Sequence, residues 1–588
     1  MLREQARTRG TATAIRQKDF GIWQPTTWSE YYERARDVAH GLGCLGLAEG
    51  GHLGILSENR IEWLLCQMGA GLCGAVTVGV YPTSPAPEVG YVLEHSDASV
   101  VICEDQEQVD KVLEIRDTLP ALTRIVVMET KGMRAYPDGI VISFAELEAT
   151  GRADRETDPD RTDVVLDRLS PDDIGLMIYT SGSTGKPKGA MLSYRNIRAQ
   201  AVGFANHFGL AAGDRYLSYL PLCHVAEQAW TVFGPTYVGT QVNFGESLRT
   251  VQEDLREVAP TVFLGVPRIW EKLNASIHIR ILEAGGYRKA LYDRALNACS
   301  GFATVPPAQR SVSQRLTYQF WYWLIFRALQ NYVGLRKARV AMTGAAPISP
   351  AVVHYFRTIG VPLLEVYGAT ETSGMVIGQQ PDRLEPGAVG VPAMGVEARL
   401  GEGDELLIQS DVVFSGYYKN EEATKSTIRD GWLHTGDVAT QSEGQFRIVD
   451  RLKDIMITAG GKNLSPSEIE NTMKASPYIK ECIVIGERRK FVSALIQVDF
   501  DTTAKWAEEQ GIAYTNFRNL SENAAVREMI AAEIDRANET LASVARIRKF
   551  HLLTKELDHD DGEVTATMKV RRASIAEKYT NEIEALYA

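Results

Sequence analysis

The chain has 588 residues and a net charge of -12, with 45% hydrophobic and 23% charged residues. This composition is typical of a globular protein large enough for two or more domains. The negative charge argues against a nucleic-acid-binding protein, whose surface would be basic. The seven cysteines show no CxxC spacing, so neither a zinc site nor a disulfide framework is predicted.

The N-terminus, MLREQARTRG, contains no apolar run of the kind found in a signal peptide. No stretch reaches the roughly 20 apolar residues that a bilayer-spanning helix needs. We therefore expect a cytoplasmic protein, and we leave open a peripheral contact at the inner face of a membrane.

Helical and strand patterns alternate through the first 120 residues. Thr27 and Glu30 form a capping box that predicts a helix from 28 to about 42. Repeated βα units predict an α/β fold with mostly parallel sheets. The polar stretch 150–168 is interpreted as a surface connection. Strands are expected at 52–57, 75–81 and 99–104, and helices at about 59–68 and 106–117.

The stretch YTSGSTGKPKG, residues 179–189, has the composition of a phosphate-binding loop. Glycines let backbone N–H groups turn toward an anion, hydroxyls add donors, and the lysines add positive charge. We expect a strand at 174–180, then the loop, then a helix opened by Ser193. The spacing does not fit the Walker pattern, and a flexible linker is the alternative. The candidate nucleotide ligands are Thr180, Ser181, Gly182, Ser183, Thr184, Gly185, Lys186 and Lys188.

YTSGSTGKPKG resembles the signature of the adenylate-forming (AMP-binding) superfamily, and the chain is most similar to its long-chain fatty acyl-CoA synthetases, including the bubblegum type. The resemblance implies a large N-terminal domain with parallel-rich β-sheets flanked by helices, and a small mobile α+β C-terminal domain. It also implies ATP, Mg²⁺ and coenzyme A, and two half-reactions. A fatty acid would form acyl-AMP and pyrophosphate, and coenzyme A would then displace AMP.

The segment LPLCHVAEQAW, residues 220–230, is similar to the part of the family that lines the acyl pocket. The resemblance implies that His224 lies near the reacting carboxylate, and a purely structural histidine is the alternative. Some long-chain relatives carry a tunnel-gating tryptophan four residues after this position. Here Gln228 stands there and Trp230 follows two residues later, so gating by tryptophan is left open.

The longest aromatic run is FWYWLIF, residues 320–326, within a helix expected from about 315 to 332. We interpret it as a helix buried against the sheet. The alternative is an interfacial helix in contact with a membrane, because Arg315 and Arg327 flank the aromatic residues.

Two further segments resemble nucleotide-contacting parts of the family. In VYGATETSG, residues 366–374, Tyr367 is expected to stack on adenine, Gly368 to admit close backbone approach and Thr370 to offer a hydroxyl. Glu371 is the carboxylate suited to Mg²⁺, with Thr184 as second ligand, and a solvated loop carboxylate is the alternative. TGAAPIS, residues 343–349, resembles the adenine-contacting turn, with Gly344, Ala345 and Ala346.

The segments GWLHTGDVA, residues 431–439, and FRIVDRLKD, residues 446–454, resemble the ribose-binding part of the family. By this resemblance Asp437 accepts hydrogen bonds from both ribose hydroxyls and Arg451 adds a donor. The alternatives are a turn-forming aspartate and a surface ion pair.

The same resemblance divides the chain into an N-terminal adenylation domain, 1–449, a hinge, 450–453, and a mobile C-terminal domain, 454–588. Lys453 occupies the hinge position. Gly460 and Gly461 lie where the backbone must pack close to pantetheine, and Ser465 with Pro466 is expected to start a helix.

Near the C-terminus, DGEVTATMKVRR, residues 561–572, resembles the long-chain form of the motif that carries the catalytic lysine. This places that lysine at Lys569, with Lys578 the weaker choice. The ammonium would stabilise the charge that develops between the carboxylate and the α-phosphate.

We expect ligation of a long- or medium-chain fatty acid to coenzyme A, with no nucleic-acid partner. Two alternatives stay open: an acyl-AMP ligase that loads a carrier protein, and a catalytically silent acyl- or nucleotide-binding protein. The sequence does not determine which acyl chain is preferred. It also does not determine whether the protein is a monomer or a homodimer.

Overall fold

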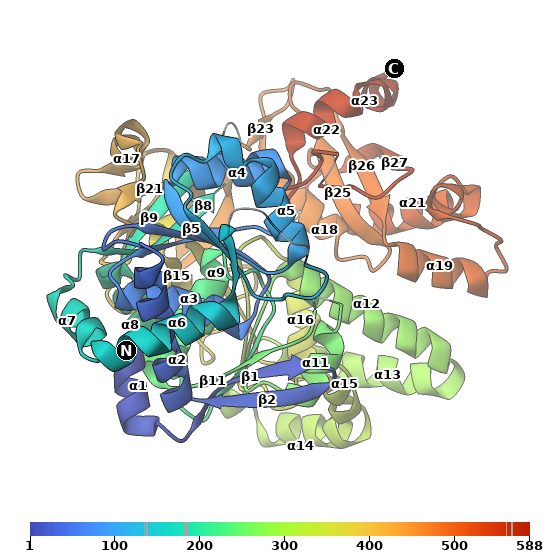
Figure 1. Cartoon of the computed structure of the whole chain (residues 1–588). Coiled ribbons are helices and arrows are strands. Elements are labelled where there is room, and N and C mark those ends of the chain that lie inside the picture. The colour runs from blue at the N-terminus through green and yellow to red at the C-terminus, as the bar shows by residue number, and fades with distance from the viewer. Residues whose placement is uncertain (134–135, 137–138, 181–185, 248, 560, 566–568) are drawn as a thin grey trace.

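The computed structural model describes residues 1–588 except 134–135, 137–138, 181–185, 248, 560 and 566–568. Figure 1 shows a large body with the C-terminal segment, in orange and red, beside its upper right side. The hydrophobic clusters of the described residues follow this division, because none mixes residues up to Ile448 with residues from Met456 onward. The domain limits and the hinge stay a prediction.

The largest sheet of the body is mostly parallel, as expected for repeated βα units. Its strands lie in the order β19 (Gly416–Tyr417), β9 (Lys188–Ser193), β8 (Ile174–Thr180), β4 (Val76–Val80), β3 (His52–Leu56), β5 (Ala98–Cys103), β6 (Arg124–Val127) and β7 (Val141–Ser143). The neighbours from β8 to β7 pair in parallel, whereas β9 pairs antiparallel with β8 and β19. The interior strands are apolar and buried because helices cover the sheet.

Three smaller sheets complete the large body. One contains β12 (Val262–Gly265), β13 (Val340–Thr343), β14 (Leu363–Ala369), β15 (Gly374–Gly378) and β16 (Val391–Pro392). A second contains β10 (Arg215–Ser218), β11 (Gln241–Phe244), β1 (Thr13–Asp19) and β2 (Ile22–Thr27). The third is antiparallel and contains β17 (Glu397–Leu400), β18 (Glu405–Gln409), β21 (Trp432–Ser442) and β20 (Ile428–Arg429), with β22 (Gln445–Arg451) paired to β21.

Two helices of the large body begin where their capping residues predict. Thr27 and Glu30 form the expected capping box at α2, and Ser193 caps α8. The helices are α1 (Leu2–Arg9), α2 (Trp28–Cys44), α3 (Ile61–Leu72), α4 (Ala86–His95), α5 (Gln106–Glu114), α6 (Phe144–Thr157), α7 (Arg161–Arg168), α8 (Tyr194–Phe208), α9 (Val225–Glu227), α10 (Gly234–Val238), α11 (Val251–Val258), α12 (Pro267–Ala284), α13 (Gly286–Cys299), α14 (Val312–Trp321), α15 (Arg327–Tyr332), α16 (Pro350–Thr358) and α17 (Glu421–Thr427).

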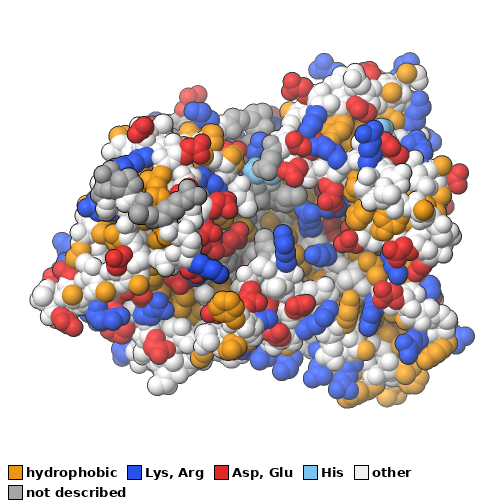
Figure 2. All heavy atoms as spheres, turned by 45° about the vertical axis from the view of Figure 1, so that its right-hand side comes forward, with side chains coloured by type: hydrophobic (Ala, Val, Ile, Leu, Met, Phe, Trp, Pro, Cys, Tyr) orange, Lys and Arg blue, Asp and Glu red, His pale blue; other side chains and the backbone are white. Residues whose placement is uncertain are grey.

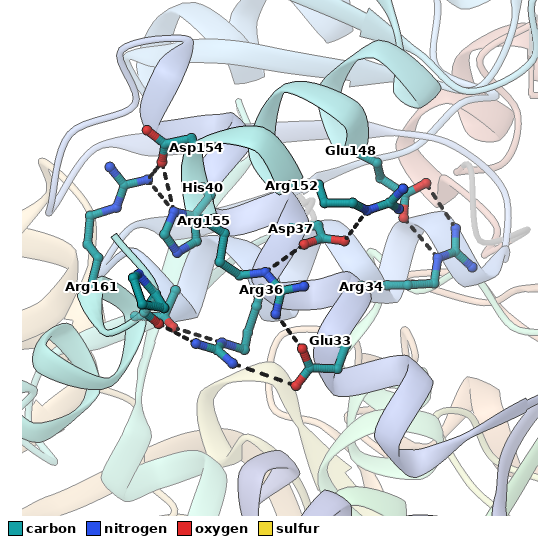
Figure 3. Close-up of polar contacts among 12 residues, drawn as sticks. Glu33, Arg34, Arg36, Asp37, His40, Glu148, Arg152, Asp154, Arg155 and Arg161 are labelled. Carbon is teal, nitrogen blue, oxygen red and sulfur yellow. Dashed lines mark hydrogen bonds and ion pairs between the residues drawn. The ribbon is translucent and has the colours of Figure 1, made fainter. Parts of the chain in front are cut away.

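The interpretation of residues 150–168 as a surface connection is wrong, because they form the second half of α6 and all of α7. Helix α6 packs on α2 at a distance that only glycine allows. A Cβ on Gly151 would lie 1.7 Å from the backbone oxygen of Asp37. The polar residues of α6 then pair with α2, as Figure 3 shows: Arg34 with Glu148 at 2.8 Å, Asp37 with Arg152 at 3.3 Å and Arg155 at 2.8 Å, and His40 with Asp154 at 2.8 Å.

The C-terminal segment has its own small sheet, formed by β25 (Ile479–Ile485), β26 (Val492–Val498) and β27 (Ile547–Leu552). A hairpin of β23 (Met456–Ile457) and β24 (Asn463–Leu464) precedes it. As expected, Ser465 caps a helix that starts at Pro466. The helices are α18 (Pro466–Met473), α19 (Phe500–Glu509), α20 (Phe517–Ser521), α21 (Ala524–Asn538), α22 (Arg572–Lys578) and α23 (Thr580–Tyr587).

The aromatic run lies in a helical stretch that begins at Val312, earlier than expected, and ends at Tyr332. A π-helical turn, Tyr322–Phe326, joins α14 to α15. Within the part of the chain that the structure describes, no helix combines the length and hydropathy needed to cross a membrane.

Candidate functional site

The predicted phosphate loop follows β8, but it leads into a second strand rather than directly into a helix. Thr180 pairs with Lys188 across the β8–β9 hairpin, and α8 begins only after β9. Residues Ser181, Gly182, Ser183, Thr184 and Gly185 lie outside the described residues, so their expected contacts stay predictions.

The two loop lysines lie against aromatic rings. The ammonium of Lys186 is 4.9 Å from the ring centre of Tyr91, and that of Lys188 is 5.0 Å from the ring centre of Tyr417. Cation–π contact at this distance is weak, about 0.5–1 kcal/mol at exposed sites. Both cations therefore remain available to a phosphate group.

Glu371 follows β14 and is held by a tyrosine that the sequence analysis did not single out. The hydroxyl of Tyr417 donates a hydrogen bond to Glu371 Oε1 at 2.6 Å. Tyr417 lies 46 residues further along the chain on the edge strand β19, which pairs with β9. Tyr417 thus connects Glu371 to the strand that follows the phosphate loop.

The other residues of this segment have structural roles that the motif did not reveal. The hydroxyl of Tyr367 donates to Asp437 Oδ2 at 2.5 Å. Gly368 is needed because a Cβ there would lie 2.0 Å from the backbone oxygen of Gly374, across the β14–β15 hairpin. Thr370 is buried at 8% exposure. The expected stacking of Tyr367 on adenine stays a prediction.

The expected adenine turn lies between β13 and α16. Gly344 faces the next strand, where a Cβ would lie 2.8 Å from Val366 Cγ2. Ala345 adopts a left-handed conformation with φ 68°, and Ala345 and Ala346 are both exposed. The turn therefore presents two small, accessible side chains at the carboxyl end of a parallel strand.

Asp437 and Arg451 lie directly opposite each other on β21 and β22. Arg451 Nε is 3.3 Å from Asp437 Oδ1. Asp437 is only 7% exposed, and its burial raises the pKa of the carboxyl, while the nearby Arg451 and the Tyr367 hydroxyl oppose that rise.

A second carboxylate supports the turn that carries Asp437. Glu405 accepts hydrogen bonds from His434 Nδ1 at 2.8 Å and from the backbone N–H of Gly436 at 2.9 Å. No recognised motif surrounds Glu405, which lies on the neighbouring strand β18, so only the sheet pairing reveals its role.

Lys569 reaches the same site from the C-terminal segment. Its ammonium lies close enough to Arg451, Asp437 and Glu371 for their charges to act on it. The surrounding protein lowers the pKa of Lys569 and the nearby Arg451 lowers it further, whereas the two carboxylates oppose this. The side chain nevertheless remains accessible to solvent. The weaker choice, Lys578, instead pairs with Glu563 at 2.6 Å.

His224 faces this cluster from the large body. Burial lowers the pKa of His224 to about 4, and the nearby charge of Lys569 acts in the same direction. Its Nδ1 accepts a hydrogen bond from the backbone N–H of Ala226 at 3.1 Å. The imidazole is therefore neutral at neutral pH and carries its proton on Nε2.

A buried polar network below His224 was not predicted. Glu227 is fully buried, and its Oε1 accepts from Ser218 Oγ at 2.5 Å and from the hydroxyl of Thr231. Its burial raises the pKa of Glu227 to about 7. Gln228 donates to the backbone oxygen of Leu222 at 2.6 Å. Together these bonds fix the loop that carries His224.

Trp230, left open as a gate, is 1% exposed. Its ring centre lies 4.6 Å from that of Tyr216 and 5.9 Å from that of Phe204. Trp230 therefore belongs to the packed core between α8 and β10.

The predicted hinge and the predicted pantetheine loop are exposed. Lys453, Gly460 and Gly461 are all accessible, and the two glycines form the turn between β23 and β24. Gly461 has φ +72° and open space around it, so the turn presents bare backbone to solvent.

The fold is that of the adenylate-forming enzymes. The chain superimposes with a TM-score of 0.72 on an anthranilate CoA ligase, AuaEII, whose structure contains anthranoyl-AMP, at 22% identity over 100% of this chain and 97% of that one. Residues 2–418 match the AMP-binding enzyme family, and residues 453–588 match the AMP-binding enzyme C-terminal domain. The chain belongs to the AMP-binding enzyme family, which confirms the resemblance seen in the sequence.

Curated relatives match over nearly the whole chain. A long-chain-fatty-acid–CoA ligase, FadD15, of Mycobacterium bovis is 33% identical over 96% of this chain and 93% of its own length. A long-chain-fatty-acid–CoA ligase of the bubblegum type, ACSBG2, of Xenopus laevis is 29% identical over 100% of this chain and 83% of its own length.

Proposed function

We propose that the chain is an AMP-forming ligase that joins a long- or medium-chain fatty acid to coenzyme A. In the first step a carboxylate oxygen attacks the α-phosphorus of ATP and pyrophosphate leaves. In the second step the sulfur of coenzyme A attacks the acyl carbonyl carbon, the thiol proton is released and AMP leaves. The observation that carries this proposal is that Lys569 lies close enough to Arg451, Asp437 and Glu371 for their charges to act on its ammonium, while Arg451 pairs with Asp437.

Each residue of the cluster has a proposed role in the first step. Asp437, positioned by Arg451 and Tyr367, accepts hydrogen bonds from the ribose hydroxyls. Lys186 and Lys188 hold the phosphates together with the loop 181–185. The ammonium of Lys569 contacts both the attacking carboxylate and the α-phosphate, where negative charge concentrates as the new bond forms.

The carboxylate of Glu371 suits a magnesium ion. A carboxylate and a hydroxyl are hard oxygen donors of the kind Mg²⁺ prefers, and Tyr417 binds only one oxygen of Glu371. We propose that Glu371 and Thr184 hold the ion. When bound, Mg²⁺ neutralises charge on the phosphates of ATP and on the leaving pyrophosphate.

We propose that His224 borders the acyl carboxylate as a neutral imidazole. A cation there would compete with Lys569 for the carboxylate, and burial excludes it by keeping the pKa low. Gly460 and Gly461 are proposed to pack against pantetheine after residues 454–588 turn about Lys453.

The test is AMP release with ATP and Mg²⁺ across acids from acetate to very long chains, with and without coenzyme A. The proposal requires sustained release only with coenzyme A. Accumulation of acyl-AMP regardless of coenzyme A would favour the ligase that loads a carrier protein. If no acid reacts, the result favours the alternative that the chain is a catalytically silent binding protein.

A further inference from the structure

A stripe of apolar side chains on α14 and the following π-helical turn faces solvent. The stripe positions recur at helical spacing, so they lie along one face. Each of them is between 49% and 74% exposed, which is unusual for a contiguous row of large apolar side chains. We call this row the exposed stripe; it consists of Val312, Leu316, Phe320, Trp323 and Leu324.

The opposite face of the same helical stretch anchors it to the large body. Tyr318, Trp321 and Tyr322 pack against the core cluster that contains the fully buried Phe326. Ser311 adds a capping box at the helix start. The exposed stripe is therefore held in a fixed position. The interpretation as a buried helix holds for one face only, and membrane contact by the other face stays a prediction.

The surroundings of the exposed stripe are basic, against the trend of the chain. Residues 294–364 contain eight Lys or Arg and no Asp or Glu, in a chain whose net charge is -12. Two of the eight do not contribute to this surface, because Arg357 is buried and Arg339 pairs with Asp214. Arg315 and Arg327 are exposed on the helix itself, and the Arg327 guanidinium lies 4.8 Å from the ring centre of Trp323. On the neighbouring α13, Asp293 pairs with Lys289 at 2.7 Å.

We propose that this surface docks the protein on anionic phospholipid membranes. The exposed stripe would enter the interfacial region of the bilayer, where aromatic rings are favoured. The arginines would stay at the level of the lipid phosphates and bind them, since their long stems allow the charge to remain in the polar layer. Helix α14 lies at the lower edge of the molecule in Figure 1, and hydrophobic side chains gather with Lys and Arg along the lower right edge of Figure 2.

The positive charge of this surface favours a lipid membrane as its partner over a second copy of this chain. Two copies meeting through this surface would bring Arg315 and Arg327 of each copy together, whereas anionic headgroups would neutralise them. The attraction must therefore weaken as the salt concentration rises.

The experiment is flotation of the full chain with phosphatidylcholine vesicles, with and without phosphatidylglycerol. We expect binding to the anionic vesicles and less binding at high salt. The variant L316S/F320S/W323S is expected to lose at least about tenfold in partitioning, and R315Q/R327Q to lose the difference between the two lipid mixtures. The matched control is V164S/M394S, which removes two apolar side chains that are 54% and 58% exposed elsewhere on the surface.

Flotation needs no turnover, so its outcome is independent of the proposed function. Unchanged thermal unfolding of the variants shows that they fold. Equal flotation of wild type and L316S/F320S/W323S would overturn the proposal, and so would absence of flotation. A dimer in light scattering that this variant dissociates would also overturn it, because the surface would then join two copies of the chain.

Discussion

Asp450 is predicted to hold the C-terminal segment against the large body. It lies at the end of β22 and is 6% exposed. Its carboxylate accepts hydrogen bonds from Ser465 Oγ at 2.7 Å, from Ser467 Oγ at 3.0 Å and from the Ser467 backbone N–H at 3.1 Å. These donors stand at the start of α18, so the bonds connect the two sides of the predicted hinge.

The substitution Asp450→Ala removes the acceptor of these three donors and of the Arg451 backbone N–H. A hydrogen bond to a charged group contributes about 1.5–3 kcal/mol. The contributions do not add in full, because freed hydroxyls turn toward water. We therefore expect the contact between α18 and β22 to weaken by about 3 kcal/mol, roughly a hundredfold in its equilibrium constant.

Hydrogen exchange measures this loss. The amides of α18 should exchange about a hundredfold faster in the variant, whereas those of α8 should not change. Acyl-AMP formation, followed by ATP–pyrophosphate exchange, should fall as well, because Lys569 reaches the site only while this segment is docked. The control is Asp501→Ala at an exposed position of α19. Unchanged exchange in α18, or an equal rise throughout the chain, would refute the reasoning.

Three further predictions test the site. Lys569→Ala should abolish ATP–pyrophosphate exchange but spare thioester formation from preformed acyl-AMP. The control Lys490→Ala, at an exposed position, should leave both reactions unchanged. A wild-type rate of exchange in Lys569→Ala would exclude the assignment. Tyr417→Phe should raise the Mg²⁺ concentration needed for half-maximal adenylation roughly tenfold, because Glu371 loses a hydrogen bond of about 1.5–3 kcal/mol, and an unchanged Mg²⁺ dependence would contradict this. Folded Glu227 stays protonated to about pH 7 while the unfolded chain ionises above about pH 4.5, so the wild type loses stability as pH rises through this range. Glu227→Gln removes that loss, and urea unfolding at pH 5 and pH 8 should show the variant gaining up to about 3 kcal/mol relative to wild type; a pH-independent difference would be evidence against the raised pKa.

Features with a local cause were predictable from the sequence. Thr27, Ser193 and Ser465 each cap the helix that follows them, because the capping hydroxyl oxygen and the backbone N–H that donates to it lie within three residues. Four strands of the large sheet, β3, β4, β5 and β8, were predicted to within a residue or two, because buried parallel strands are continuous apolar runs. The other strands of this sheet were not predicted.

Features formed between distant segments were not predictable in the same way. The helical residues at 150–157 looked like a polar connection because Arg152 and Arg155 are paired with Asp37 of α2, more than 100 residues earlier. Tyr417 and Glu405 lie in no recognised motif, and they support Glu371 and the Asp437 turn only because sheet pairing brings them there.

By itself, the sequence determined the family, the fold class and the residue types that the chemistry needs, because these depend on motifs whose parts are close in the chain. Only the tertiary structure decided which of them meet. Lys569 lies close enough to Asp437 and Glu371 for their charges to act on it, although well over 100 residues separate them, because the C-terminal segment docks against the large body. It also decided that the aromatic helix shows one face to the core and the other to solvent, since exposure depends on what packs against a helix.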